Sequence, residues 1–368
     1  DNIVRYEFPL MQWSIAMVEK VTGEHIIVMR LMVYLISLLT LFAVFKLALT
    51  LTDNKDISAI AVWIFAFMPT FFYNSTSIMP DVLALCFGMF YVLYFFKHLK
   101  SNKRSDLFYA ALFIALAGLA KLPFILLGIL SFIRAVELMF KSQPNRWQEV
   151  FRYASVKAIA LLPVMAWYAM VIPEWKDNNI TDGFITNFVG WPLFKEFLKN
   201  QIYVNFPTEI LNIPALLLFF AGVFFILKTR KVFLARPMYF FIPLLILFMY
   251  FFYILNVIRE GHEYYLMPFY PILMLPIIGT VYQAWQGKMV AKIIVGMLLL
   301  AMPFVCWNQE KDYWDVKYAY FNQDFFNCRE ELEKIGTQDD KAVFINDESL
   351  AILPYIADKS GYIFWNNH

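Results

Sequence analysis

The sequence predicts an all-α polytopic membrane protein with about ten membrane-crossing helices and a small extracytoplasmic α/β portion at its C-terminal end. Three observations support this fold class. Hydrophobic residues make up 61% of the 368 positions and charged residues only 16%, whereas soluble domains usually carry about 25% charged residues. Apolar runs long enough to cross a membrane recur along the chain. Lys and Arg gather in every second connection between those runs.

The apolar runs fix the number and direction of the expected crossings. A helix needs about 20 apolar residues to cross the hydrocarbon core. The runs lie at 25–51, 57–73, 79–97, 107–120, 122–139, 154–174, 209–228, 237–257, 265–285 and 289–306. Because Lys and Arg favour the cytoplasmic side, the basic connections place alternate loops inside. The runs therefore begin and end outside.

Residues 107–139 are expected to form a short helix hairpin. Basic connections flank the stretch on both sides, so both of its ends should be cytoplasmic. A leg of about 15 residues reaches only about 22 Å at 1.5 Å per residue. Pro123 favours a break at the apex, because proline lacks a backbone donor. Lys121 is thereby predicted to lie at a recessed tip below the outer membrane surface.

Three regions are expected. Residues 1–24 form an extracytoplasmic loop with an amphipathic helix at 9–23 that lies on the outer surface. Residues 25–306 form the transmembrane helical domain, with a long outer loop at 175–208 whose aromatic residues suit the headgroup level. Residues 307–368 carry dense charge and form a soluble extracytoplasmic portion, expected to be incomplete. Since the chain begins at Asp1, we expect it to be part of a longer protein.

Composition and missing motifs narrow the function. The formal net charge is +2, and basic residues do not cluster in the manner of a nucleic-acid-binding face. The chain contains no Walker loop, Gly-rich dinucleotide turn, His-Glu-x-x-His or Gly-x-Ser-x-Gly motif. An enzyme working on the outer face would therefore need a donor carried in the membrane. We expect Cys306 and Cys328 on the outer side. They either form a disulfide or remain two unpaired thiols.

Two outer carboxylates are candidate catalytic residues. Glu7 lies just before the expected interfacial helix, and Asp81 opens the third crossing directly after Pro80. A carboxylate near a helix N-terminus is also favoured by the helix dipole or by capping. For each residue, two interpretations therefore remain: a charge that only stabilises the start of a helix, or a catalytic role.

Two further features offer positive charge and hydrogen bonds. Lys121 could reach the surface as a structural residue or meet a lipid phosphate, and its recessed position favours the phosphate. The segment from Arg259 to Tyr265 gathers a guanidinium, an imidazole, carboxylates and phenols in one short outer loop. Arg suits phosphate, and His262 suits metal or proton chemistry. A solvated polar turn is the alternative there.

These features, in this order, resemble the GT-C superfamily of membrane glycosyltransferases that use polyprenyl-phosphate sugars. The resemblance is to the bacterial branch similar to protein O-mannosyltransferases and the lipid A aminoarabinose transferase. The segments that carry it are Glu7-Phe-Pro-Leu10, Met79-Pro-Asp81, Gly118-Leu-Ala-Lys121-Leu-Pro123 and His262-Glu-Tyr-Tyr-Leu-Met-Pro268. In that family an acidic motif upstream usually supplies the general base, and the resemblance implies that this position lies before Asp1.

The resemblance implies a glycosyltransferase that moves a sugar from a polyprenyl-phosphate donor to a lipid, glycan or protein acceptor. Its site would face the periplasm of a bacterial cytoplasmic (inner) membrane. Glu7 and Asp81 would be the catalytic pair. The substrate-binding residues would be Tyr6, Lys121, Arg259, His262 and Tyr264. A divalent cation is a possible cofactor, with Glu7 and His262 as its candidate ligands.

Two other classes of protein fit the composition. A transporter or lipid flippase also has many crossings and intramembrane charge, but it tends to show inverted repeats and broken helices near the midplane. No internal repeat is evident here, and the ionisable residues concentrate at one face. A non-catalytic scaffold that binds through residues 307–368 is the third hypothesis.

Overall fold

The computed structural model describes residues 5–23, 25–140, 144–175, 190–229, 236–258, 262–314, 324–337, 340–345 and 352–364. The chain divides into two compact units, Asp1–Gln309 and Glu310–His368. The first unit is a bundle of apolar helices, and the second is a small α/β unit.

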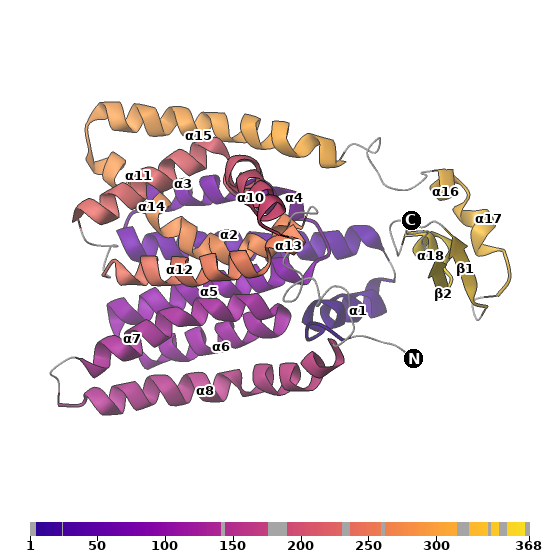
Figure 1. Cartoon of the computed structure of the whole chain (residues 1–368), viewed down its shortest axis with the longest axis horizontal. Helices are drawn as coiled ribbons and strands as arrows, with labels where there is room; N and C mark the ends of the chain where they lie inside the picture. Colours follow the sequence, from indigo (N-terminus) through magenta and orange to yellow (C-terminus); the bar gives the residue numbers. More distant parts are fainter. Residues whose placement is uncertain are drawn as a thin grey trace. The chain divides into compact units, whose positions relative to one another are not determined.

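The first unit is built from long helices that run side by side (Figure 1). Its α-helices are α1 (Leu10–Thr22), α2 (Ile26–Thr52), α3 (Lys55–Ala66), α4 (Pro69–Asn74), α5 (Pro80–Ser101), α6 (Arg104–Ala120), α7 (Ile129–Met139), α8 (Arg146–Val171), α10 (Trp191–Asn200), α11 (Ile213–Thr229), α12 (Met238–Tyr253), α13 (Leu255–Ile258), α14 (Tyr270–Gln286) and α15 (Met289–Glu310). Shorter 3₁₀ segments are η1 (Leu122–Gly128), η2 (Ile172–Trp175) and η4 (Glu263–Phe269), and η3 (Gln201–Ile210) is a π-helix.

The helices confirm the predicted fold class but not the predicted number of crossings. Each of the ten apolar runs contains a helix. In the described part of the chain, six helices are long and apolar enough to cross a membrane, or seven if α10–η3 and α11, bent by 106°, form one span. The shortfall has a local cause. The helices α3, α6 and α12 have 12, 17 and 16 residues. Each is shorter than the about 20 residues that a helix typically needs to cross the membrane.

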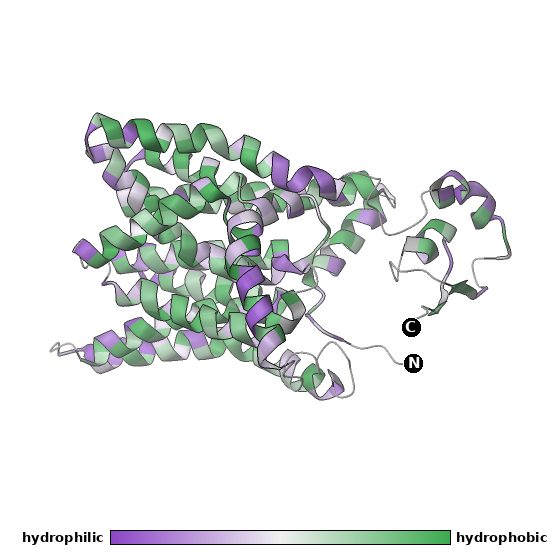
Figure 2. Ribbon diagram, turned by 45° about the horizontal axis from the view of Figure 1, so that its top comes forward, coloured by the Kyte–Doolittle hydropathy of each residue, from purple (hydrophilic) through white to green (hydrophobic). Residues whose placement is uncertain are grey.

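Hydrophobic residues make up most of the long helices of the first unit (Figure 2). The helices α8 and α15 lie at opposite edges of the first unit (Figure 1), and they expose Met165 and Leu300. The interior spans α5 and α14 are the most buried. Extensive exposed apolar surface on both edges is unsuited to water. The first unit is therefore that of an integral membrane protein.

Two surface segments refine the sequence prediction. The helix α1 forms where an interfacial helix is expected; it buries Met11 and Ile15 and exposes Trp13, Met17 and Val21. The expectation of a long loop at 175–208 is wrong for its second part, because α10 and η3 are helical from Trp191 onward. The segment formed by α10 and η3 is bent by 106° from α11.

The second unit contains short helices and two strands, in keeping with the predicted α/β portion. Its elements are η5 (Lys311–Trp314), α16 (Asp324–Asn327), α17 (Arg329–Glu333), β1 (Ala342–Ile345), α18 (Ile352–Ala357) and β2 (Gly361–Phe364). The two strands pair in parallel, from Ala342 opposite Gly361 to Ile345 opposite Phe364. Cys328 is exposed in this unit, whereas Cys306 is buried in the first.

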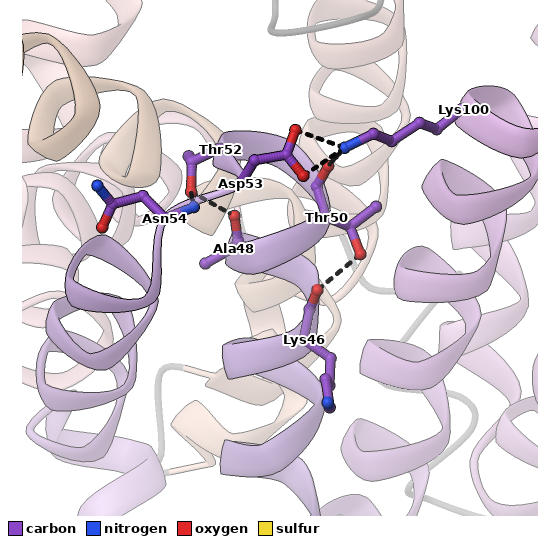
Figure 3. Close-up of polar contacts among 7 residues, drawn as sticks. All are labelled: Lys46, Ala48, Thr50, Thr52, Asp53, Asn54 and Lys100. Carbon is purple, nitrogen blue, oxygen red and sulfur yellow. Dashed lines mark hydrogen bonds and ion pairs between the residues drawn. The ribbon is translucent and has the colours of Figure 1, made fainter.

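The end of the bundle where α2 and α5 finish is held by an exposed ion pair (Figure 3). Lys100 Nζ lies 2.7 Å from both carboxylate oxygens of Asp53 and donates to the carbonyl oxygen of Thr50. Both side chains are well exposed. Exposed ion pairs contribute about 0.2–1 kcal/mol. We therefore expect Lys100→Ala to lower the free energy of unfolding by less than about 1 kcal/mol, measured by denaturant titration in detergent.

Candidate functional site

Three ionisable side chains that lie far apart in the sequence meet at one place in the first unit. Lys121 Nζ lies 2.5 Å from Glu7 Oε1 and 3.5 Å from Asp81 Oδ2. The Lys121 side chain is 10% exposed and that of Asp81 only 2%. Charged groups buried within a membrane protein are costly and usually mark function. We call Glu7, Asp81 and Lys121 the ion triad.

The hairpin that carries Lys121 forms as the sequence predicts. The helix α6 ends at Ala120, where Lys121 takes an extended backbone conformation and its N–H donates to the carbonyl oxygen of Ala117. The 3₁₀ segment η1 begins at the next residue, with Pro123 in its first turn. Gly88 on α5 permits the return leg to pack closely, because a Cβ there would lie 3.0 Å from the Phe124 ring.

Asp81 lies in the first turn of α5 but does not cap the helix. The N-cap residue is Met79, and Pro80 occupies the first helical position, as proline often does. Asp81 Oδ2 is buried and, among the described residues, accepts no hydrogen bond within normal distance. Its nearest cation is Lys121. The burial and this pairing favour a role in the site over simple capping.

Glu7 lies on a segment, residues 5–9, that is held against the ends of α6 and α8 by main-chain atoms. The Phe8 N–H donates to the carbonyl oxygen of Leu119 at 3.1 Å. The indole N–H groups of Trp167 and Trp175 donate to the carbonyl oxygens of Tyr6 and Arg5, at 3.2 and 2.7 Å. The Arg5 side chain also pairs with Glu174.

A plain helix-start charge does not describe Glu7. The helix α1 begins only at Leu10, with Pro9 at the N-cap, and its first turn contains no acidic residue. The Glu7 carboxylate instead bonds Lys121, 114 positions away in sequence. Two carboxylates and one ammonium give the ion triad a formal charge of −1. At this spacing each carboxylate stabilises the charged form of the lysine.

Tyrosines surround the ion triad, and the sequence analysis missed three of them. Lys121 Nζ lies 4.8 Å from the centroid of the Tyr265 ring, a cation–π contact. The Tyr250 hydroxyl donates to the Tyr265 carbonyl oxygen at 3.2 Å. The Tyr168 hydroxyl is buried without a hydrogen-bond partner among the described residues, within electrostatic range of Glu7 and Lys121. A chain with 21 tyrosines gives little signal for any one of them.

The remaining predicted residues lie at the edge of this group or outside the described residues. Tyr264 is within electrostatic range of all three members of the ion triad. Its hydroxyl is 3.1 Å from His262 Nδ1, and its ring stacks on Tyr265 with centroids 4.9 Å apart. Tyr6 packs near Trp175. Arg259 lies outside the described residues.

The predicted metal candidates are not part of a larger ligand group in the described part of the chain. There, no three His, Cys, Asp or Glu side chains are arranged to hold a metal ion. Glu7 bonds Lys121, and His262 bonds Tyr264.

Comparisons with known proteins agree with the fold and the motifs. Residues 7–169 match the family model described as dolichyl-phosphate-mannose-protein mannosyltransferase. That match includes all three members of the ion triad. A comparison with curated proteins gave no match.

Solved structures share the fold at low sequence identity. ArnT from Cupriavidus metallidurans, bound to undecaprenyl phosphate, is 11% identical with a TM-score of 0.61, covering 98% of this chain and 76% of that one. The apo state of the same protein is 12% identical with a TM-score of 0.60, over the same shares of both chains. The oligosaccharyltransferase of Archaeoglobus fulgidus, in complex with Zn and sulfate, is 11% identical with a TM-score of 0.52. The match covers 89% of this chain and 49% of that one.

The fold is thus one that this chain shares with ArnT and with the archaeal oligosaccharyltransferase. The match over residues 7–169 and the shared fold agree with the resemblance that the ordered motifs carry. They support glycosyl transfer in general.

Proposed function

We propose that this protein transfers a sugar from a polyprenyl-phosphate donor to a lipid, glycan or protein acceptor. The observation that carries the proposal is Lys121, a buried ammonium held by two carboxylates at the turn between α6 and η1. A donor with a lipid tail reaches such a position through the bilayer. The undecaprenyl phosphate bound to ArnT, which has a similar fold, supports a donor of this kind.

The chemistry is an inverting displacement. The acceptor oxygen attacks the anomeric carbon and loses its proton to a base, while the bond from that carbon to the phosphate oxygen breaks. The electron pair stays on the departing phosphate. Positive charge aimed at the place where negative charge develops is an effective means of lowering such a barrier. Lys121 supplies that charge, with Arg259 as its partner.

The other site residues orient the two substrates. Glu7 and Asp81 direct the acceptor toward the donor. Tyr6, His262 and Tyr264 contact the phosphate or the sugar through hydroxyl and imidazole groups. Glu7 and His262 are the candidate ligands for a divalent cation, and transfer rates with and without a chelator decide whether one takes part.

We also propose that the protein lies in a bacterial cytoplasmic membrane with this site facing the periplasm. The basic connections support this orientation, because Lys and Arg favour the cytoplasmic side. Lys100 and Arg104 lie at the opposite ends of α5 and α6 from Asp81 and Lys121. A donor presented on the outer leaflet would then meet the ion triad directly.

The test is sugar transfer by the purified full-length natural protein in liposomes. A panel of polyprenyl-phosphate sugars is supplied with extracts of periplasmic glycans and lipids as acceptors. We expect a sugar to become covalently attached to one acceptor class with release of polyprenyl phosphate. Movement of the intact donor between leaflets without covalent transfer would refute the proposal and revive the flippase reading.

Asp81→Asn is expected to lower transfer by about 10²-fold, as the loss of a positioning group commonly does. The amide keeps the size of the side chain but removes the charge that holds Lys121. The measurement is the initial transfer rate, with the unfolding midpoint as a control for folding. Wild-type transfer by a well-folded Asp81→Asn variant would remove Asp81 from the site.

A further inference from the structure

Lys121 already has counter-ions when no substrate is present. Glu7 lies at 2.5 Å and Asp81 at 3.5 Å, and the Tyr265 ring covers the ammonium. The formal charge of the ion triad is −1. A phosphate that approaches Lys121 therefore meets net repulsion unless one carboxylate moves away, since like charges at close range in a poorly hydrated site repel strongly.

Glu7 is the carboxylate able to move. Asp81 belongs to the first turn of α5 and is buried, with its side chain 2% exposed, whereas the Glu7 side chain is 22% exposed. The segment of residues 5–9 is anchored through the main chain of Arg5, Tyr6 and Phe8. The Glu7 side chain can thus rotate away from Lys121 without breaking any of these three contacts.

We propose that Glu7 is a displaceable counter-ion. Its carboxylate moves away from Lys121 when the donor phosphate binds, and it pairs with Lys121 again as the polyprenyl phosphate product leaves. This inference rests on the proposed function. It gives Glu7 a role in product release, in addition to directing the acceptor.

The charges of the sugar-bearing donor and of the polyprenyl phosphate product explain why a displaceable counter-ion is useful. The donor is a phosphodiester with a charge of −1. Transfer breaks its bond to the sugar and leaves a phosphomonoester, which carries about −1.5 to −2 at pH 7 because its second pKa is near 6. Lys121 alone would therefore hold the product more tightly than the donor. Competition from Glu7 acts more strongly against the more negative product, so the exchange favours its departure.

Glu7→Gln tests the idea through binding, without any need for turnover. We expect this variant to bind polyprenyl phosphate at least about tenfold more tightly than the wild type, which corresponds to about 1.4 kcal/mol. Its affinity for the sugar-bearing donor should rise less, by about three- to fivefold, because that lipid carries the smaller charge.

Glu174→Gln is the matched control. Glu174 is also a carboxylate on the outer side, but it pairs with Arg5 and not with Lys121. Its replacement removes one negative charge near the same segment, so it should leave the affinity for polyprenyl phosphate within about twofold of wild type. An equal gain in both variants would indicate a general charge effect and overturn the proposal.

A second measurement uses the wild type, in case Glu7→Gln fails to fold. A carbodiimide activates carboxylates, and a neighbouring amine then forms an amide with loss of the urea. A cross-link between Glu7 and Lys121 should form in the empty protein and fall at least about fivefold with polyprenyl phosphate, but not with neutral polyprenol. An unchanged cross-link at saturating polyprenyl phosphate, or an unchanged product affinity in Glu7→Gln, overturns the inference and leaves the proposed function intact. Failure of the wild type to bind either lipid overturns both.

Discussion

Lys121→Ala is expected to lower sugar transfer by about 10³-fold, the upper range for loss of one group that stabilises developing negative charge. The change removes the cation of the ion triad and leaves Glu7 and Asp81 facing one another. Phosphate then meets two carboxylates with no compensating charge at that position. The measurement is the initial rate of transfer from a polyprenyl-phosphate sugar, at saturating donor and acceptor.

Lys100→Ala is the matched control for that experiment. Lys100 also pairs with a carboxylate, Asp53, but at the opposite end of α5 and in an exposed position (Figure 3). This variant should transfer sugar at the wild-type rate. A Lys121→Ala protein that unfolds at the wild-type midpoint and keeps more than about a tenth of the wild-type rate would contradict the assigned role, given the loss that such groups usually cause.

Gly222→Val is expected to have the largest effect on folding. A Cβ at Gly222 would lie 2.0 Å from the carbonyl oxygen of Pro276 and 2.5 Å from its carbonyl carbon. These are backbone atoms of α14, which cannot rotate away as a side chain can. Thr280 ties the same two helices together by donating to the Leu218 carbonyl oxygen at 2.7 Å. Small residues let membrane helices approach this closely.

The expected cost is about 3 kcal/mol or more, at the upper end of overpacking effects. It should appear as a lower unfolding midpoint and a lower yield of monodisperse protein in detergent. Gly296→Val is the control, because a Cβ at Gly296 on α15 has no atom within 4 Å. Equal stability of the two variants would mean that α11 and α14 do not pack as the structure describes.

Much of the fold could be predicted because membrane helices follow simple rules. Each apolar run contains a helix, and the break at Lys121 and Pro123 falls where charge and proline predict it. The number of crossings could not be obtained in the same way. Run 57–73 is divided between α3 and α4 by a break before Pro69, and hydropathy alone does not separate one long helix from two short ones.

The helix at α10 shows a signal that the sequence analysis overlooked. Gly190 precedes Trp191, and Pro192 lies within its first turn. Proline near a helix start is a known sequence signal. The aromatic residues in this region instead suggested a loop at the headgroup level.

The candidate site could be predicted in its members but not in its contacts. Glu7, Asp81 and Lys121 each attracted notice because charge is rare in so apolar a chain. That both carboxylates pair with the same ammonium depends on the crossing of α5 and α6 and on the path of residues 5–9, which no local pattern encodes. Tyr168 is contributed by packing alone. Tyr265 had one available signal, its position beside His262 and Tyr264.

The most direct test of the central claim is the place where the lipid phosphate binds. A polyprenyl phosphate with a photoreactive diazirine on its first isoprene unit can be cross-linked to the purified protein in liposomes. Mass spectrometry then identifies the labelled residues. We predict labels within 117–124 and 262–266, both lost in Lys121→Ala. Labels that persist in Lys121→Ala, or that fall on the basic end of the bundle around Lys100, would contradict the assignment of this site.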